Sequence, residues 1–132
     1  MRMVVAASTD KGSATREMIL DRAYLLASRK GVEGLSIGEL AAAAKMSKSG
    51  VFAHFGSREE LQLAVLDAAA QRFTEHVFLP AIRERRGLPR LDAIGRRWME
   101  WLRSEEGGCP MVSAAIEYDD RPGVIRDRVV HW

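Results

Sequence analysis

The sequence of 132 residues contains a single cysteine, Cys109. One cysteine excludes an internal disulfide framework and fits a reducing compartment, so we expect a cytoplasmic protein. No stretch approaches the roughly 18 uninterrupted apolar residues of a membrane-spanning helix. The apolar patch at the N-terminus is also too short for the core of a signal peptide. The sequence therefore predicts no membrane partner.

Alternating strand patterns, internal repeats and low-complexity tracts are also missing, and the composition of 47% hydrophobic and 29% charged residues is typical of a globular domain. We predict an all-α fold. The net charge is only +2, yet residues 1–58 carry net +4 and residues 59–132 carry net −2. This asymmetry favours an anionic partner for the first half of the chain.

The clearest pattern lies between Leu35 and Arg58, where three serines occupy positions typical of helix N-caps: Ser36, Ser47 and Ser57. A glutamate follows three residues after the first and the last of them, which makes two capping boxes. The caps predict one helix beginning at 37, a second over 48–55 and a third beginning at 58. Two helices of about eight residues with a short turn between them form a helix-turn-helix.

Two cations follow these caps in an unexpected place. Lys48 and Arg58 stand in the first turns of their helices, where the partial positive charge of the helix end disfavours a cation. A bound phosphate would reverse that cost, because amide donors and a nearby cation together form an anion site. The alternative, that both are solvated surface charges, stays open.

Apolar residues at helical spacing predict further helices outside this region. The first covers 15–30 and is ended by Gly31, and the helix that begins at 58 extends to about 79, where Pro80 ends or kinks it. After a connector at 81–90, helices are predicted over 91–106, 109–118 and 124–130. Residues 1–13 have no sustained period. We predict a flexible arm at 1–13, a helix-turn-helix domain at 14–57 and a helical ligand-binding and dimerisation domain at 58–132.

The segment from Thr15 to Leu61 resembles the N-terminal domain of TetR-type transcriptional regulators. The resemblance rests on the order of these residues: Thr15, Ile19, Ala23, Gly31, Leu40, Ala41, Ser47, Lys48, Phe55, Ser57 and Leu61. It implies a homodimeric repressor that binds a palindromic operator in double-stranded DNA. The half-sites would lie about 34 to 36 Å apart, or a multiple of that spacing. It also implies release from the operator by a small-molecule effector, of unknown identity, bound by the C-terminal helices.

The resemblance assigns DNA contacts residue by residue. Positions where family members touch phosphates are Ser36, Ser47, Lys48, Phe52, His54 and Arg58, and positions where bases are approached are Ser49 and Gly50. Four residues depart from the family pattern, and one of them, Gly50, offers no side chain to a base. Lys45 replaces the usual turn glycine, which costs roughly 1 kcal/mol if its φ is positive. Phe52 has no hydroxyl for a phosphate, and Gly38 lies inside a helix, where glycine is disfavoured.

Length is a further departure, because family chains continue past the point where this one stops. The last residues, 130–132, lie in mid-pattern, so we expect a C-terminal domain that is only partly present. Three explanations stay open: the chain is a fragment, its dimer is built differently, or it is a monomer.

The candidate effector site is a set rich in aromatic rings and sulfur: Trp98, Trp101, Cys109, Met111, Glu117 and Tyr118. The alternative is plain core packing, because aromatic residues at helical spacing usually fill a core. Glu117 differs from the rest of the set, since a buried carboxylate needs a partner.

Two other classes of function remain as alternatives. An enzyme would need Cys109 as nucleophile with His76 or His131 as base, and a metal site would need adjacent acids, namely Glu105, Glu106, Asp119 and Asp120. A lone cysteine and acids at helix ends are more often structural, so we expect no enzyme, no cofactor and no metal. The second alternative is a helical protein-interaction module in which Trp98 and Trp101 dock a partner helix.

Overall fold

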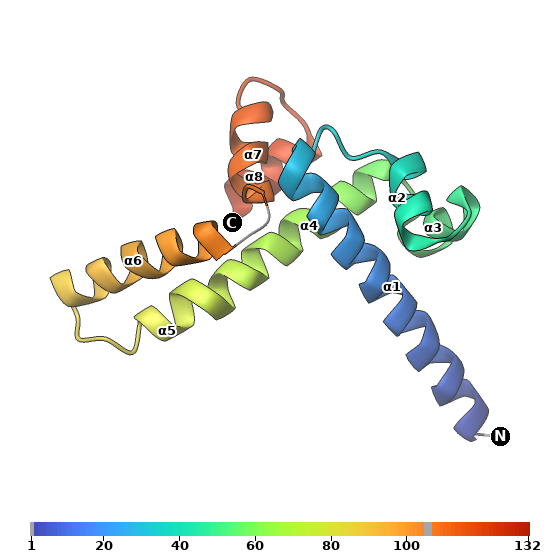
Figure 1. Ribbon diagram of the computed structural model, residues 1–132, viewed down its shortest axis with the longest axis horizontal. Helices are drawn as coiled ribbons and strands as arrows, with labels where there is room; N and C mark the ends of the chain where they lie inside the picture. Colours follow the sequence, from blue (N-terminus) through green and yellow to red (C-terminus); the bar gives the residue numbers. More distant parts are fainter. Residues whose placement is uncertain (1, 105–106) are drawn as a thin grey trace.

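In the computed structural model, the backbone is described for residues 2–104 and 107–132, and side chains are described from residue 11 onward within those ranges. Every regular element in these ranges is helical (Figure 1). In chain order they are α1 (Arg2–Lys30), α2 (Ile37–Ala44), α3 (Lys48–Phe55), α4 (Arg58–Phe73), η1 (Thr74–Phe78), α5 (Leu79–Ala81), α6 (Leu88–Ser104), α7 (Pro110–Glu117) and α8 (Val124–His131). The predicted all-α fold with an N-terminal helix-turn-helix is confirmed.

The three cap serines begin helices as predicted. Their hydroxyls accept hydrogen bonds from the amides three residues later: Ser36 from Glu39 at 3.4 Å, Ser47 from Gly50 at 3.1 Å and Ser57 from Glu60 at 3.1 Å. Each serine has extended backbone, so it stops the preceding segment and starts the next helix. Local capping therefore determines where α2, α3 and α4 begin.

The N-terminal segment corrects one sequence prediction. Residues 2–13 were expected to form a loose arm, but they are the first turns of α1, which projects away from the other helices (Figure 1). The segment contains no proline, and extending an existing helix costs little compared with starting one. A helix without an amphipathic period can therefore continue from the packed part of α1.

The long helix after Ser57 continues to Ala81 but changes its winding on the way. The α-helical ladder gives way to the wider π-helical turn η1, in which the amide of Leu79 donates to the carbonyl of Thr74. The imidazole Nδ1 of His76 lies 2.9 Å from the carbonyl of Arg72, and this nitrogen is the donor because a carbonyl only accepts. Pro80 follows directly. The wider turn accommodates a residue that has no amide hydrogen and whose ring crowds the preceding turn.

One apolar core joins the two ends of the chain. It contains buried residues of α1 to α4 together with three from the C-terminal part, Ala114, Tyr118 and Ile125. A second, smaller core of Val77, Trp101 and Cys109 lies where α6 returns beside η1 (Figure 1). Helices α7 and α8 therefore pack directly against the bundle that carries α2 and α3.

Candidate functional site

Helix α3 presents one face to solvent and buries the other. Val51 and Phe55 lie in the core, and they fix the orientation of the helix. The opposite face begins at the helix N-terminus, where its exposed residues are Ser47, Lys48, Ser49 and Phe52, with Gly50 and His54 half-buried beside them. The structure therefore brings together on one short helix the α3 residues that the resemblance assigned to DNA.

The N-terminus of α2 lies next to Lys48. A methyl group built at Gly38 would be 3.5 Å from Cε and 3.8 Å from Nζ of Lys48, and 3.7 Å from the hydroxyl of Ser36. The Lys48 ammonium and the Ser36 hydroxyl thus flank the same stretch of backbone. Since the amides at a helix N-terminus point outward, this corner combines helix-end donors, a hydroxyl and a cation, which suits a phosphate group.

The turn between the two helices depends on a left-handed residue that is not glycine. Lys45 has φ 55° and ψ 43°, and its amide donates to the carbonyl of Ala42 at 3.2 Å. The next amide, that of Met46, donates to Ala41 at 2.9 Å. These hydrogen bonds end α2. Lys45, which stands where family members usually have glycine, is therefore a strained position of the turn.

Close packing around Gly50 explains why this position lacks a side chain. A methyl group at this position would lie 3.2 Å from both Met46 Cε and the hydroxyl of Ser47. Those contacts are tight, and the Ser47 hydroxyl is the cap of α3. A side chain at Gly50 would therefore disturb the cap, and the Ser49 hydroxyl also touches it, at 3.1 Å from the hydroxyl of Ser47.

Arg58 has intramolecular partners in this structure. Its Nε donates to the carbonyl of Leu35 at 2.9 Å, and its Nη2 donates to the carbonyl of Glu33. The guanidinium thus holds the loop between α1 and α2, a role that the sequence did not suggest. Its assignment to a phosphate stays a prediction.

A cavity of about 460 Å³ lies between α4, η1, α6, α7 and α8. Its lining is almost entirely apolar: Ala69, Ala70, Phe73, Thr74, Phe78, Trp98, Trp101, Cys109, Met111, Val112, Val129 and Trp132. Phe73 makes edge-to-face contacts with Trp98 and Trp101, each with ring centroids 6.1 Å apart. Four of the residues predicted to bind an effector, Trp98, Trp101, Cys109 and Met111, therefore line one cavity.

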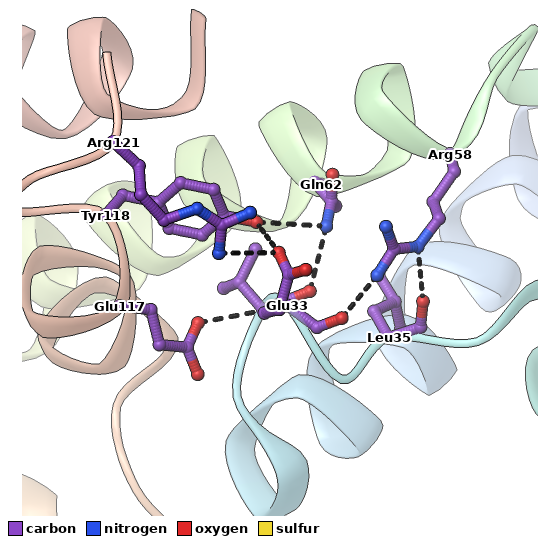
Figure 2. A network of polar contacts seen from close by, with 8 residues as sticks. Glu33, Leu35, Arg58, Gln62, Glu117, Tyr118 and Arg121 are labelled. Carbon is purple, nitrogen blue, oxygen red and sulfur yellow. Dashed lines mark hydrogen bonds and ion pairs between the residues drawn. The ribbon is translucent and has the colours of Figure 1, made fainter. Parts of the chain in front are cut away.

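Glu117 and Tyr118, the other two residues of that set, lie elsewhere. They face the loop between α1 and α2 (Figure 2). Glu117 Oε2 accepts a hydrogen bond from the amide of Glu33 at 3.1 Å, and the Tyr118 hydroxyl donates to the Glu33 carboxylate. Arg121 lies 3.3 Å from the same carboxylate. The partner expected for Glu117 is thus a backbone amide 84 residues away.

This polar group changes the acidity of two side chains. Burial, followed by the hydrogen bond to Glu33, raises the pKa of Tyr118 to about 12. The hydrogen bond from Tyr118, opposed by partial burial and supported by Arg121, lowers the pKa of Glu33 below its usual value. Sequence reasoning missed Glu33, Gln62 and Arg121, because no local spacing connects a loop acid with a tyrosine 85 residues later.

The sequence offered Cys109, His76 and His131 as candidates for catalysis. Cys109 is buried in the cavity lining, and His131 stacks edge-to-face on Trp132. Within the described ranges, no group of three or more His, Cys, Asp or Glu could hold a metal ion. Glu105 and Glu106 lie outside the described residues. In the part of the chain that the structure describes, no helix is both long and apolar enough to cross a membrane.

Comparison with known proteins agrees with this geometry. Residues 19–65 match the family described as bacterial regulatory proteins of the tetR family, and residues 87–132 match the Tetracyclin repressor-like C-terminal domain. The chain belongs to the TetR family. TetR-family regulators are generally DNA-binding proteins rather than enzymes. No curated protein matches the sequence.

Two solved structures share this fold over 92% of the chain. A TetR transcriptional regulator from Chloroflexus aurantiacus J-10-FL is 31% identical, with a TM-score of 0.81 over 92% of this chain and 63% of that one. A TetR-family transcriptional regulator from Cytophaga hutchinsonii is 22% identical, with a TM-score of 0.73 over 92% of this chain and 62% of that one, and this likeness concerns the fold. The present chain thus spans somewhat less than two thirds of the length of these relatives.

Proposed function

We propose that the protein is a DNA-binding transcriptional regulator that inserts α3 into the major groove of duplex DNA. The observation that carries the proposal is the α2–turn–α3 unit. Its caps fix two short helices, its apolar face lies in the core, and its remaining face presents Ser47, Lys48, Ser49 and Phe52 to solvent. A short helix with polar residues exposed at its N-terminus suits base reading in a major groove.

The phosphate contacts in this proposal come from the corner formed by Ser36, Gly38 and Lys48. Lys48 is exposed, and it has no ion-pair partner within the described residues, so its charge is available to an anion. Ser49, exposed on the first turn of α3, is the side chain that we assign to a base edge. Phe52 contributes a van der Waals contact to the sugar-phosphate backbone.

The regulatory part of the proposal is repression relieved by a small molecule in the cavity. The lining of the cavity contains no charged residue and five aromatic ones: Phe73, Phe78, Trp98, Trp101 and Trp132. The hydroxyl of Thr74 already donates to Ala70 at 2.9 Å. An uncharged and largely apolar effector fits these walls, because a charged one would lose its hydration without a partner.

Selection of bound duplexes from a random pool, at low salt where phosphate contacts are strongest, tests the proposal. We expect the selected sequences to share a palindrome whose half-sites lie about 34 to 36 Å apart or a multiple of this spacing, as two copies of the chain require. If no duplex is retained at low salt, the protein is not a DNA-binding regulator, and a helical protein-interaction module becomes the better explanation.

A further inference from the structure

The turn that joins α5 to α6 concentrates positive charge, and we call residues 82–91 the basic turn. It contains four arginines, Arg83, Arg85, Arg86 and Arg90, and one acid, Glu84, which gives it a net charge of +3. The whole of residues 59–132 carries net −2, so the remainder of that half carries net −5. The basic turn is therefore a positive patch on an otherwise acidic part of the chain.

Backbone hydrogen bonds fix the shape of the basic turn. The Nε and Nη2 atoms of Arg90 donate to the carbonyl of Glu84 at 3.2 and 3.0 Å. Gly87 has a φ of 93°, a left-handed conformation that favours glycine, and its carbonyl accepts from the amides of Arg90 and Leu91, each at 3.1 Å. One arginine thus holds the turn together, and the other three are displayed on it.

The three remaining arginines point their charge at solvent. Arg83, Arg85 and Arg86 are exposed, and none of them forms an ion pair with another residue in the part of the chain that the structure describes. The first acid of α6, Asp92, lies instead 3.9 Å from Arg96. A guanidinium group binds phosphate oxygens with two parallel hydrogen bonds. Three such groups in succession suit a surface that is rich in phosphates.

Two leucines stand exposed among these arginines. Leu88 is 79% exposed and Leu91 is 65% exposed. They are three residues apart at the beginning of α6, so they lie on the same side of the helix. Large apolar side chains that are exposed together mark an interaction surface. The partner of the basic turn must therefore supply hydrocarbon as well as negative charge.

Few partners have both properties. The backbone of duplex DNA presents phosphates but little hydrocarbon to cover two leucines, and a second copy of the basic turn would be repelled by its equal charge. In a bilayer with anionic phospholipids, by contrast, phosphates lie directly above the acyl chains. The basic turn also lies at the projecting end of the helical hairpin, on the opposite side of the molecule from α3 (Figure 1). A projecting end can reach a flat surface.

We propose that the basic turn binds the surface of membranes that contain anionic phospholipids. Arg83, Arg85 and Arg86 bind the phosphates of the headgroups, and Leu88 and Leu91 enter the boundary between headgroups and acyl chains. Such binding is peripheral, so it needs none of the long apolar stretches whose absence led us to expect no membrane partner. It is independent of DNA binding by α3, which lies at the other end of the molecule (Figure 1).

Flotation of the full chain with lipid vesicles tests this proposal. We expect strong binding to vesicles of phosphatidylcholine and phosphatidylglycerol in equal amounts, and weak binding to phosphatidylcholine alone. Arg83→Ala and Arg86→Ala should each lower the partition coefficient about fivefold, the scale of one arginine at an anionic membrane surface. Leu88→Ser should lower it about tenfold, because the leucine no longer enters the boundary.

Arg103→Ala is the matched control. It removes the same charge from an exposed position in the last turn of α6, away from the basic turn, and should leave the partition coefficient unchanged. Because all of the substituted side chains are exposed, circular dichroism should show the helix content and Tm of the wild-type protein for every variant.

Equal binding to the two kinds of vesicle would overturn the proposal, as would binding to neither, in which case an acidic protein becomes the better partner for the basic turn. A loss in Arg103→Ala as large as that in Arg86→Ala would overturn it too, because net charge alone would then explain the binding. Full binding by Leu88→Ser would refute insertion of the leucines. Failure to retain any duplex would refute the proposed function and leave the vesicle result standing.

Discussion

At the scale of single residues, the turn of the helix-turn-helix stores strain at Lys45. Its φ of 55° is a conformation in which a side chain costs about 1 kcal/mol. Lys45→Gly should therefore raise the free energy of unfolding by about that amount, measured by urea denaturation. Gly56 provides the opposite test, since its φ is 73° and no atom lies near a methyl built there. Gly56→Ala should lower the same quantity by about 1 kcal/mol. Loss of stability in Lys45→Gly would contradict the assigned strain.

Substitution of Gly38 by alanine should change stability and duplex affinity in opposite directions. A methyl group there meets Lys48 and Ser36 only at ordinary contact distances, so Gly38→Ala should stabilise α2 by about 0.5 kcal/mol. The same methyl group fills the space between the Ser36 hydroxyl and the Lys48 ammonium. We therefore expect duplex affinity to fall about tenfold, roughly the loss of one charge-assisted hydrogen bond. Unchanged affinity in a folded Gly38→Ala protein would show that no phosphate enters this corner.

At the scale of elements, the polar contacts of the loop between α1 and α2 (residues 31–36, the junction loop) predict a pH dependence. Tyr118 has an ordinary pKa of 10.0 that the folded protein raises to about 12, so the neutral phenol is favoured. Its contribution to stability is complete below pH 10 and is lost as the pH rises toward 12. Tyr118→Phe should show a smaller fall in Tm between pH 10 and 12 than the wild-type protein. Parallel curves for the two proteins would contradict this.

Glu33, the acid of the same network, gives stability the opposite dependence on pH. The pKa of Glu33 is lowered by Tyr118 and by the guanidinium groups of Arg121 and Arg58. Its contribution is therefore present above the ordinary carboxyl pKa of 4.5 and lost as the pH falls through the lower folded value. This dependence belongs to the junction loop, because all of these groups face it.

The elements themselves were largely predictable. Helix starts at Ile37, Lys48 and Arg58 followed from capping, which acts within three or four residues and is therefore visible in sequence. Contacts between elements far apart in the chain could not be predicted from the sequence. The helical state of residues 2–13 was not predicted because these residues have no amphipathic period, which a projecting helix does not need. The role of Arg58 was missed because its partners are backbone carbonyls of another loop.

At the scale of the whole molecule, the effector site was predicted only in part. The aromatic and sulfur residues at helical spacing converge on the cavity, since they belong to helices that pack together. Glu117 and Tyr118 were grouped with them as the one acid and a further aromatic residue of the set, yet they face the loop between α1 and α2. The two ends of a helix can pack against different parts of the molecule. The position of a residue along the helix does not show which of these parts it contacts.

The chemistry of the cavity can be tested with two related fluorescent probes. Neutral N-phenyl-1-naphthylamine and its anionic relative anilinonaphthalene sulfonate differ mainly by a sulfonate. We expect the neutral probe to bind and to quench the fluorescence of Trp98 and Trp101, and the anionic probe to bind more weakly, because the walls contain no cation. Trp101→Phe, which keeps an aromatic wall, should retain binding with less quenching. Tighter binding of the anionic probe would contradict an uncharged effector.

The central claim, that the α2–α3 unit binds duplex DNA through Lys48 and the cap residues, is tested most directly by the salt dependence of duplex binding. For the wild-type protein, log affinity should fall linearly with log salt concentration, and Lys48→Ala should reduce this slope by about one unit. Arg103→Ala removes an equal charge from the exposed side of α6 and should leave the slope unchanged. An unaltered slope in Lys48→Ala, or an equal change in Arg103→Ala, would contradict the assigned interface.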